Sequence, residues 1–200
     1  MGIYAVKPLF QKSLAPVARL FVALNIHPDY VNLAGLIVSL GMAASLFFAR
    51  DCPALFWILP AGAFVRTACN ALDGMVARGL SVSSPMGEVY NELLDRISDA
   101  AIFACVGISG LGTVENAFAA TVFVLLNSYT GILAKAAGGK RIYAGVIGKA
   151  DRMILIGLAG IISFFYLTPF TWNIFLLILT AGSAIALLQR LRIIRKDLSR

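Results

Sequence analysis

Residues 70–99 read NALDGMVARGLSVSSPMGEVYNELLDRISD, two helix-forming runs that carry acids and amides at regular intervals. If each run is an α-helix, its polar positions share one face, because residues three and four apart are neighbours on a helix surface. The first face holds Asn70, Asp73 and Ala77, and the second holds Gly87, Asn91, Asp95 and Asp99. The link GLSVSSPMG at 79–87 has the glycine, serine and proline residues typical of a turn. The stretch therefore predicts a helical hairpin whose two polar faces meet.

The composition places this hairpin in a membrane. Of the 200 residues, 60% are hydrophobic and the mean hydropathy is +0.86, against roughly 45–50% apolar content in soluble domains. A helix needs roughly 20 apolar residues to cross a bilayer, and the apolar stretches of that order are 30–49, 54–76, 88–111, 116–137, 148–168 and 172–194. Residues 1–24 mix basic and apolar side chains as an interfacial amphipathic helix does. We predict an all-α polytopic membrane protein, with an interfacial helix at 1–24 and one domain of six transmembrane helices at 25–200.

The Lys and Arg residues that give the net charge of +7 fall mostly on one side of the predicted membrane spans. Lys and Arg lie before the first predicted span, between spans two and three, around the link from four to five, and after span six, whereas the opposite side has only Arg50. Cytoplasmic loops keep an excess of Lys and Arg, so both termini are predicted to be cytoplasmic in a multi-pass protein of a bacterial inner membrane. Such boundary charges suit anionic lipid headgroups. They do not form the continuous basic and aromatic surface that nucleic acid requires, so no nucleic-acid partner is expected.

Five of the ten acidic residues lie between Asp73 and Asp99. Charged groups inside membrane segments are costly and usually face a functional cavity. The structural alternative is that these acids only pair with Arg66, Arg78 and Arg96. Oxygen ligands converging from two helices suit a hard cation such as Mg²⁺ or Mn²⁺ rather than zinc or copper. The pattern therefore predicts a divalent-cation site between the second and third spans.

These residues resemble the signature of the CDP-alcohol phosphatidyltransferases, DxxDGxxARx8Gx3Dx3D. The matching positions are Asp73, Gly74, Ala77, Arg78, Gly87 and Asp95, and the departures are Asn70 and Asn91, where the signature has aspartate. The segments NIHPDYVNLAG at 25–35 and IGKADR at 147–152 also resemble parts of that family. The resemblance implies six transmembrane helices after an interfacial helix, often in a homodimer.

The resemblance also implies the reaction and the roles of the residues. A phosphatidyl group passes from a CDP-diacylglycerol-like lipid to a small alcohol or phospho-alcohol, with release of CMP. Asp95 is the implied base on the acceptor hydroxyl. The implied cation ligands are Asp73, Asp95, Asn70, Asn91 and Asp99. Asp99 is the first candidate to compensate for the charge lost at the asparagines, and Glu88 and Glu92 are weaker ones. The implied donor nucleotide site comprises Asn70, Asp73, Gly74, Ala77, Arg78 and Gly87. A second register, in which Asp95 and Asp99 are the last two signature aspartates, stays open because four residues nearly complete a helical turn.

The acceptor is expected to meet basic residues near the fifth span. Lys149 and Arg152 lie one turn apart at its predicted start, with Lys140 and Arg141 just before it. They are candidates for a phosphate on the acceptor, although topology alone would also place them there. The sequence does not distinguish glycerol phosphate, an inositol phosphate, serine, choline or ethanolamine as the acceptor.

Two other functions compete with this interpretation. Asn70 and Asn91 are compatible with a family member that has lost turnover and only binds lipid or nucleotide. The intramembrane acids are compatible with an ion-coupled transporter, although the inverted repeats and broken helices typical of transporters are not found in the sequence.

Overall fold

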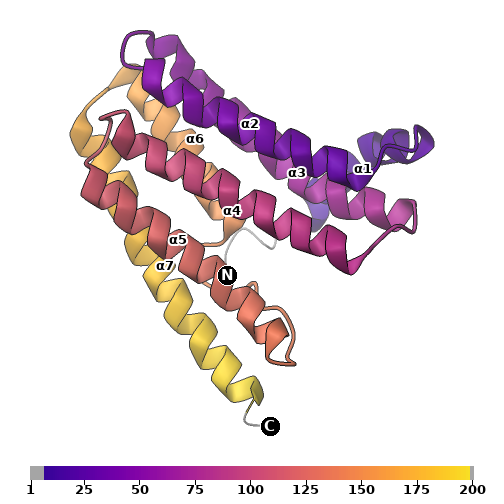
Figure 1. The fold of residues 1–200 in the computed structure, drawn as a ribbon. Coiled ribbons are helices and arrows are strands. Elements are labelled where there is room, and N and C mark those ends of the chain that lie inside the picture. Colours follow the sequence, from indigo (N-terminus) through magenta and orange to yellow (C-terminus); the bar gives the residue numbers. More distant parts are fainter. Residues whose placement is uncertain (1–6, 199–200) are drawn as a thin grey trace.

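The computed structural model describes residues 7–198. Within this range the chain forms α-helices and one short 3₁₀ helix, and no strand. In chain order they are α1 (Lys7–Ala23), α2 (Pro28–Phe48), η2 (Pro53–Trp57), α3 (Ile58–Gly79), α4 (Pro85–Ile108), α5 (Val114–Ala136), α6 (Lys149–Phe165) and α7 (Pro169–Leu198). The predicted all-α class is confirmed, and each of the six predicted apolar stretches forms a helix (Figure 1).

Prolines and capping side chains set where several helices begin. Pro28 and Pro85 stand in the first turn of α2 and α4, where the missing N–H is not needed. Ser84 accepts a hydrogen bond from the backbone N–H of Gly87 at 3.0 Å and so caps α4. As a result α4 begins at Pro85, before the predicted start at residue 88, and it ends at Ile108 instead of residue 111.

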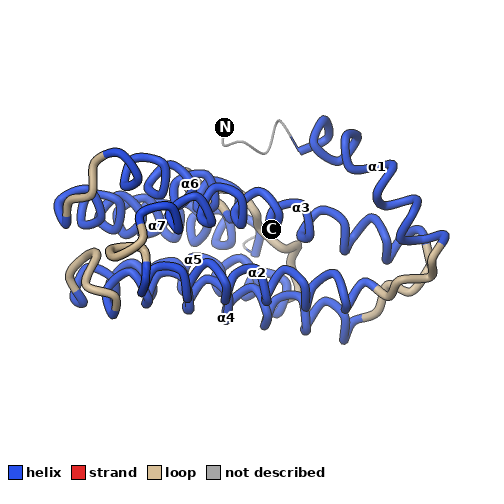
Figure 2. The backbone as a smooth tube through the Cα atoms, turned by 90° about the horizontal axis from the view of Figure 1, so that it is seen from above, coloured by secondary structure: helices blue, strands red, loops and turns tan. Residues whose placement is uncertain are grey.

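The helices form two layers. Seen from above, α3 and α6 lie in one layer and α2 and α4 in the other (Figure 2). α2 contacts both α3 and α4, and α5 contacts α4 and α7. α6 approaches η2 and α3 closely at Gly160, where a Cβ atom would lie 2.8 Å from the carbonyl oxygen of Phe56. Because α6 runs antiparallel to α3, the first turns of α6 come to lie beside Arg66 in the middle of α3.

The largest core cluster lies where α4 ends and α7 begins. Its buried aromatic side chains are Phe56, Phe103, Trp172 and Phe175. The Trp172 ring lies 6.1 Å from that of Phe56 and 5.6 Å from that of Phe175, distances at which aromatic rings attract one another. The acidic signature lies toward the opposite ends of α3 and α4, so the core anchors the bundle and leaves the other end for polar groups.

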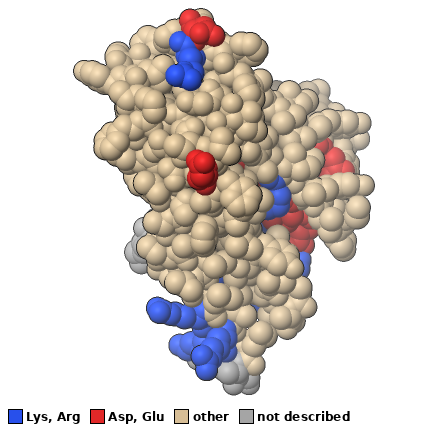
Figure 3. All heavy atoms as spheres, turned by 60° about the vertical axis from the view of Figure 1, so that its left-hand side comes forward, with Lys and Arg blue, Asp and Glu red and all other residues tan. Residues whose placement is uncertain are grey.

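Four segments of the described chain are long and apolar enough to cross a membrane, 28–48, 53–79, 114–136 and 169–198. α4 is less apolar because it carries five charged residues, and α6 has only 17 residues. Large apolar side chains such as Ile37, Phe118 and Leu188 are exposed. Uncharged residues cover most of the face in Figure 3, while Lys and Arg gather near the C-terminal end of α7. These features are those of a membrane protein.

α1 packs against α3 through an apolar face. Ala18, flanked by Leu14 and Phe21, contacts a small cluster that contains Val31 and Leu72. Leu9 and Leu20 are exposed on other sides of the helix. The helix itself is therefore present within predicted segment 1–24, of which residues 1–6 lie outside the described range.

Candidate active site

The two polar faces predicted from residues 70–99 meet in the structure. Asn91 of α4 donates its side-chain amide to Oδ2 of Asp73 of α3 at 2.7 Å. The other oxygen of Asp73 accepts the backbone N–H of Gly74 at 2.5 Å. Asp73 and Asp95 are both buried, with 6% and 7% of their surface exposed. Asp73 is thus held by two hydrogen bonds at the interface of the two helices.

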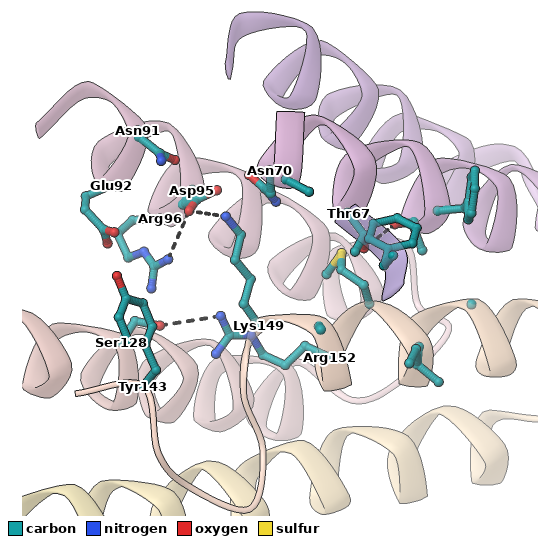
Figure 4. A pocket seen from close by; sticks show the side chains of 18 of the residues that line it. Thr67, Asn70, Asn91, Glu92, Asp95, Arg96, Ser128, Tyr143, Lys149 and Arg152 are labelled. Carbon is teal, nitrogen blue, oxygen red and sulfur yellow. Dashed lines mark hydrogen bonds and ion pairs between the residues drawn. The ribbon is translucent and has the colours of Figure 1, made fainter. Parts of the chain in front are cut away.

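The first residue of α6 joins this site. Lys149 donates a hydrogen bond to Oδ2 of Asp95 and forms an ion pair with it. Arg96, next to Asp95 on α4, places its Nη2 3.8 Å from the same oxygen. Figure 4 shows both cationic groups directed toward Asp95. One carboxylate therefore connects α4 to α6 at the point where the acceptor residues were predicted.

Asp99 lies two turns beyond Asn91 on α4 and is fully buried. Its Oδ1 accepts a hydrogen bond from Arg66 at 2.8 Å, and its Oδ2 accepts one from Arg152 at 2.8 Å. Arg66 therefore forms an ion pair with an acid of the cluster. Because both oxygens of Asp99 are engaged by guanidinium groups, this residue links α3, α4 and α6.

A cavity of about 540 Å³ opens beside Asp95 between α3, α4 and α6. Its polar part is lined by Asn70, Asn91, Glu92, Asp95, Arg96, Ser128, Arg141, Tyr143, Lys149, Arg152 and Arg190. Its apolar part is lined by Phe10, Pro60, Ala63, Phe64, Met153, Ile154, Leu158 and Ile161, among others. Figure 4 shows Asp95 and Arg96 of α4 facing Lys149 at the start of α6. The cavity is therefore amphipathic, with a cationic polar end.

The link between α5 and α6 closes one side of the cavity. Arg190 of α7 donates to the backbone carbonyl oxygens of Asn127 and Ala144, the latter at 2.8 Å. The link packs on α5 at Gly131, where a Cβ atom would lie 2.6 Å from the carbonyl oxygen of Ile142. Arg141 of this link pairs with Glu92 of α4 and stacks over the Tyr143 ring at 4.6 Å. The link is thus fastened to three helices.

The predicted site residues divide by position. Those that line the cavity are Asn70, Asn91, Asp95, Arg141, Lys149 and Arg152. Gly74, Ala77, Arg78 and Gly87 lie nearer the link between α3 and α4, and Lys140 and Arg78 are exposed. A Cβ atom at Gly74 would lie 3.3 Å from Nη1 of Arg78, which places these two predicted donor residues side by side.

Some lining residues had no assigned role in the sequence analysis. Arg96, Ser128, Tyr143 and Arg190 are among them. For Arg96, its position next to Asp95 in the sequence was a signal that could have placed it in the site. Ser128 and Arg190 gave none, because only the packing of α5 and α7 against the link brings them to the cavity.

The oxygen atoms near Asp73 fit a hard divalent cation. Asp73 and Asp95 could supply carboxylates and Asn70 and Asn91 could supply amide oxygens, which are ligands that Mg²⁺ and Mn²⁺ accept. Within the described range no three His, Cys, Asp or Glu residues form a metal-binding cluster. A cation held here would therefore rely on two carboxylates complemented by neutral amides.

Solved structures of a similar protein share this fold. The Mycobacterium tuberculosis phosphatidylinositol phosphate synthase PgsA1 with CDP-DAG bound has 28% identity and a TM-score of 0.69, covering 90% of this chain and 92% of that one. PgsA1 in complex with manganese and citrate has 27% identity and a TM-score of 0.70, covering 90% and 87%. The manganese complex agrees with the predicted requirement for Mg²⁺ or Mn²⁺, which is confirmed at the level of the family.

Sequence comparison identifies the family. The "Inner membrane protein YnbA" of Escherichia coli K12 is 34% identical over 173 residues, which cover 86% of this chain and 86% of that protein. The pattern of the CDP-alcohol phosphatidyltransferases matches residues 25–189, nearly the whole helical domain. The chain therefore belongs to the CDP-alcohol phosphatidyltransferase family, and the predicted class of membrane phospholipid-synthesis enzyme is confirmed.

Proposed function

We propose that this protein transfers the phosphatidyl group of CDP-diacylglycerol to a phosphorylated polyol and releases CMP. The observation that carries the choice of acceptor is the charge of the cavity. Its cationic lining residues are Arg96, Arg141, Lys149, Arg152 and Arg190, and its acidic ones are Glu92 and Asp95. A surplus of cationic side chains along the cavity favours an anionic ligand beyond the pyrophosphate of the donor.

The donor is supported by the shape of the cavity. Its apolar part, between α3 and α6, offers Phe64, Met153 and Leu158 to acyl chains. Its polar part starts at Asn70, one turn from Asp73. A lipid with a pyrophosphate headgroup matches this division, and the similar PgsA1 was crystallised with CDP-DAG. We assign Asp73, Gly74, Ala77, Arg78 and Gly87 with Asn70 to the nucleotide end.

The acceptor is assigned to the side of the cavity formed by α6 and the preceding link. Lys149, Arg152 and Arg141 line this side, and Arg96 faces them from α4. Arginine guanidinium groups bind phosphate oxygens in pairs. Lys140 is exposed outside the cavity, so we assign it to the approach of the acceptor. The naming of PgsA1 as a phosphatidylinositol phosphate synthase supports an inositol phosphate as the first acceptor to test.

The chemical step is an in-line substitution at the phosphorus that bears the diacylglycerol. The acceptor oxygen forms a new bond to this phosphorus, the bond to the oxygen of CMP breaks, and CMP leaves with that oxygen and its electron pair. The acceptor proton passes to the carboxylate of Asp95, which lines the cavity. Lys149 orients Asp95 through its ion pair, and Arg96 lies on the same side of the carboxylate.

The divalent cation would be held by Asp73, Asp95, Asn70 and Asn91. When bound, it neutralises charge on the pyrophosphate and on the leaving phosphate. Asp99 was also a predicted ligand, but its two oxygens are held by Arg66 and Arg152. We therefore propose a structural role for Asp99 and the ungapped register of the signature, in which Asn91 takes the third aspartate position.

The membrane arrangement is part of the proposal. α2 to α7 would cross the membrane six times, with α1 in the interface and both termini in the cytoplasm of a bacterium, at its inner membrane. Support comes from basic residues near the ends of α3, α5 and α7 and the start of α6, and from the name of the similar E. coli protein. Cysteine labelling from either side would test the orientation, and cross-linking in the membrane would test the homodimer that the resemblance implies.

The function is tested by CMP release from CDP-diacylglycerol. Purified protein in mixed micelles with Mg²⁺ or Mn²⁺ is given inositol phosphate, glycerol phosphate, serine, choline or ethanolamine separately. We expect release with a phosphorylated polyol and not with the amino alcohols. Metal-dependent nucleotide binding without release would instead support a member that has lost turnover, and ion flux in liposomes would support a transporter.

A further inference from the structure

We propose that Glu92 selects the acceptor substrate, because its carboxylate accepts a hydrogen bond from a hydroxyl group of that substrate. This inference rests on the proposed function, because it concerns the same cavity and the same class of acceptor. Glu92 lies outside the signature shared with the family. Besides Asp95 it is the one acidic side chain that lines the cavity within the described range.

A second carboxylate is unexpected in a cavity for phosphates. An ionised carboxylate can only accept hydrogen bonds, and it repels the anionic groups of both substrates. It is favourable there only if it meets a cation or a hydroxyl group. Figure 4 shows Glu92 beside Asn91 on the wall that α4 contributes, one turn before Asp95. The carboxylate is therefore placed next to the proposed base.

The contacts of Glu92 leave one oxygen for a ligand. Its Oε1 pairs with Arg141 of the link between α5 and α6, and Arg141 is stacked over the Tyr143 ring at 4.6 Å. Its Oε2 is buried and has no hydrogen-bond partner. Buried polar atoms are normally satisfied, so this oxygen is a site that a bound hydroxyl group would complete.

Arg96 supplies the matching donor. Glu92 and Arg96 are four residues apart on α4, a spacing at which the two charges commonly pair. In the described chain they do not pair, since Glu92 turns to Arg141 and Arg96 to Asp95. Nε and Nη1 of Arg96 are also buried without a partner. One unsatisfied acceptor and two unsatisfied donors in one cavity suit a ligand with both hydroxyl groups and phosphate oxygens, as in a phosphorylated polyol.

The geometry also explains why such an acceptor would be distinguished from a simple phosphate ester. Residues three apart on a helix are neighbours, so the hydroxyl group that Glu92 binds is next to the one that reacts at Asp95. A phosphate ester with a single carbon, such as methyl phosphate, has neither of these two hydroxyl groups. A site that binds a hydroxyl group rejects analogues without it, because its buried polar atoms are then left unpaired.

The test compares phosphate esters with and without hydroxyl groups. Binding of inositol 1-phosphate, glycerol 3-phosphate and methyl phosphate to the full-length protein in nanodiscs is measured by calorimetry, with Mg²⁺ and CMP present. We expect the wild type to prefer a polyol phosphate over methyl phosphate by about tenfold or more, the effect of one charge-assisted hydrogen bond. Glu92→Gln should reduce this preference severalfold, to what the contact with Asp95 alone provides, and raise the acceptor KM more than it lowers kcat.

Glu88→Gln is the matched control. Glu88 lies one turn earlier on α4 and pairs with Lys135, but it does not line the cavity, so its variant should keep the preference. If Glu92→Gln does not fold, Glu92→Asp, which keeps the charge and shortens the side chain, should still reduce the preference. Thermal unfolding of each variant identifies loss of fold.

Two results would overturn the inference. The first is an unchanged preference in Glu92→Gln, and the second is a wild type that binds methyl phosphate as tightly as both polyol phosphates. If the unchanged preference is accompanied by weaker Mn²⁺ binding of Glu92→Gln in electron paramagnetic resonance, Glu92 is a cation ligand instead. CMP release by the wild type is measured in parallel, so failure of the transfer reaction is seen separately from failure of the selection.

Discussion

Asn91 donates its side-chain amide to Asp73 across the interface of α4 and α3, at 2.7 Å. The family signature has a carboxylate at each of these positions, and two carboxylates at this separation would repel one another without a cation between them. The amide removes that repulsion, so this half of the site is stable before any cation binds. The same exchange lowers the negative charge that attracts the cation, which leads to the first prediction.

Asn91→Asp should strengthen cation binding. The variant restores a carboxylate next to Asp73, and affinity for hard cations rises with ligand charge. We expect the Kd for Mn²⁺, measured by electron paramagnetic resonance, to fall by about tenfold, the effect of about 1.4 kcal/mol. With chelator present the variant should unfold more readily than the wild type. Gln11→Glu on α1 adds the same charge elsewhere, and an equal gain in that control would refute the assignment of Asn91 to the cation site.

Asp95→Asn should nearly abolish transfer without loss of fold. Removal of a general base typically costs about 10²-fold or more in rate, and the amide keeps the size of the side chain. CMP release is the measurement, and thermal unfolding with chelator present checks the fold. Glu115→Gln, exposed at the other end of the bundle, should release CMP as the wild type does. Retention of more than about a tenth of the rate by Asp95→Asn would move the base to another residue.

Asp99→Asn should destabilise the protein more than any other single change to the acids. The variant leaves Arg66 and Arg152 buried without their carboxylate, and breaking a buried ion pair from one side costs about 3–5 kcal/mol. Reversible unfolding in SDS measures the loss. Asp197→Asn, on the exposed end of α7, should show no loss.

The same variant distinguishes the two registers of the signature. A stable Asp99→Asn protein that no longer binds Mn²⁺ would favour the register in which Asp99 is the last signature aspartate. A destabilised protein that still binds Mn²⁺ would support the ungapped register.

Gly131→Ala should displace the link between α5 and α6. The new Cβ atom would lie 2.6 Å from the carbonyl oxygen of Ile142, and overpacking of this kind costs about 1–3 kcal/mol. Because the link carries Arg141 and Tyr143, we expect a higher KM for the acceptor with little change in donor binding. The control is Gly41→Ala on α2, where a Cβ atom meets nothing within 4 Å. Equal kinetics in the two variants would contradict the role of the link.

The local part of the site could be predicted from the sequence. Spacing of three and four residues on a helix determines which side chains share a face, so the stripes through Asp73 and through Asn91 and Asp95 followed directly from residues 70–99. The turn residues at 79–87 determined that the two helices fold back on each other. Composition determined the membrane class, and apolar runs of about 20 residues determined the helical fold, because barrel strands are only about 10 residues long and alternate in polarity.

The partners of these residues depended on the tertiary structure. Lys149 lies 54 residues from Asp95 in the chain, and no local spacing relates the two positions. They meet because small residues such as Gly160 let α6 approach η2 and α3. The sequence suggested Asp99 as a cation ligand because it could not show the residues that contact it. In the structure Arg66 and Arg152 reach Asp99 from two other helices.

In the cavity, too, some features could be predicted from the sequence and others depended on the tertiary structure. The basic residues around 140–152 were visible in the sequence as a charge cluster, but their direction was not. Arg141 turns inward to Glu92, whereas Lys140 stays exposed, because the link is packed on α5 at Gly131 and held by Arg190 of α7. By itself the sequence determined the helices, their polar faces and the chemistry of the signature, since these follow from short-range periodicity. The packing of distant helices decided which charges pair and which face the substrate, since side chains far apart in the chain meet only when the bundle closes.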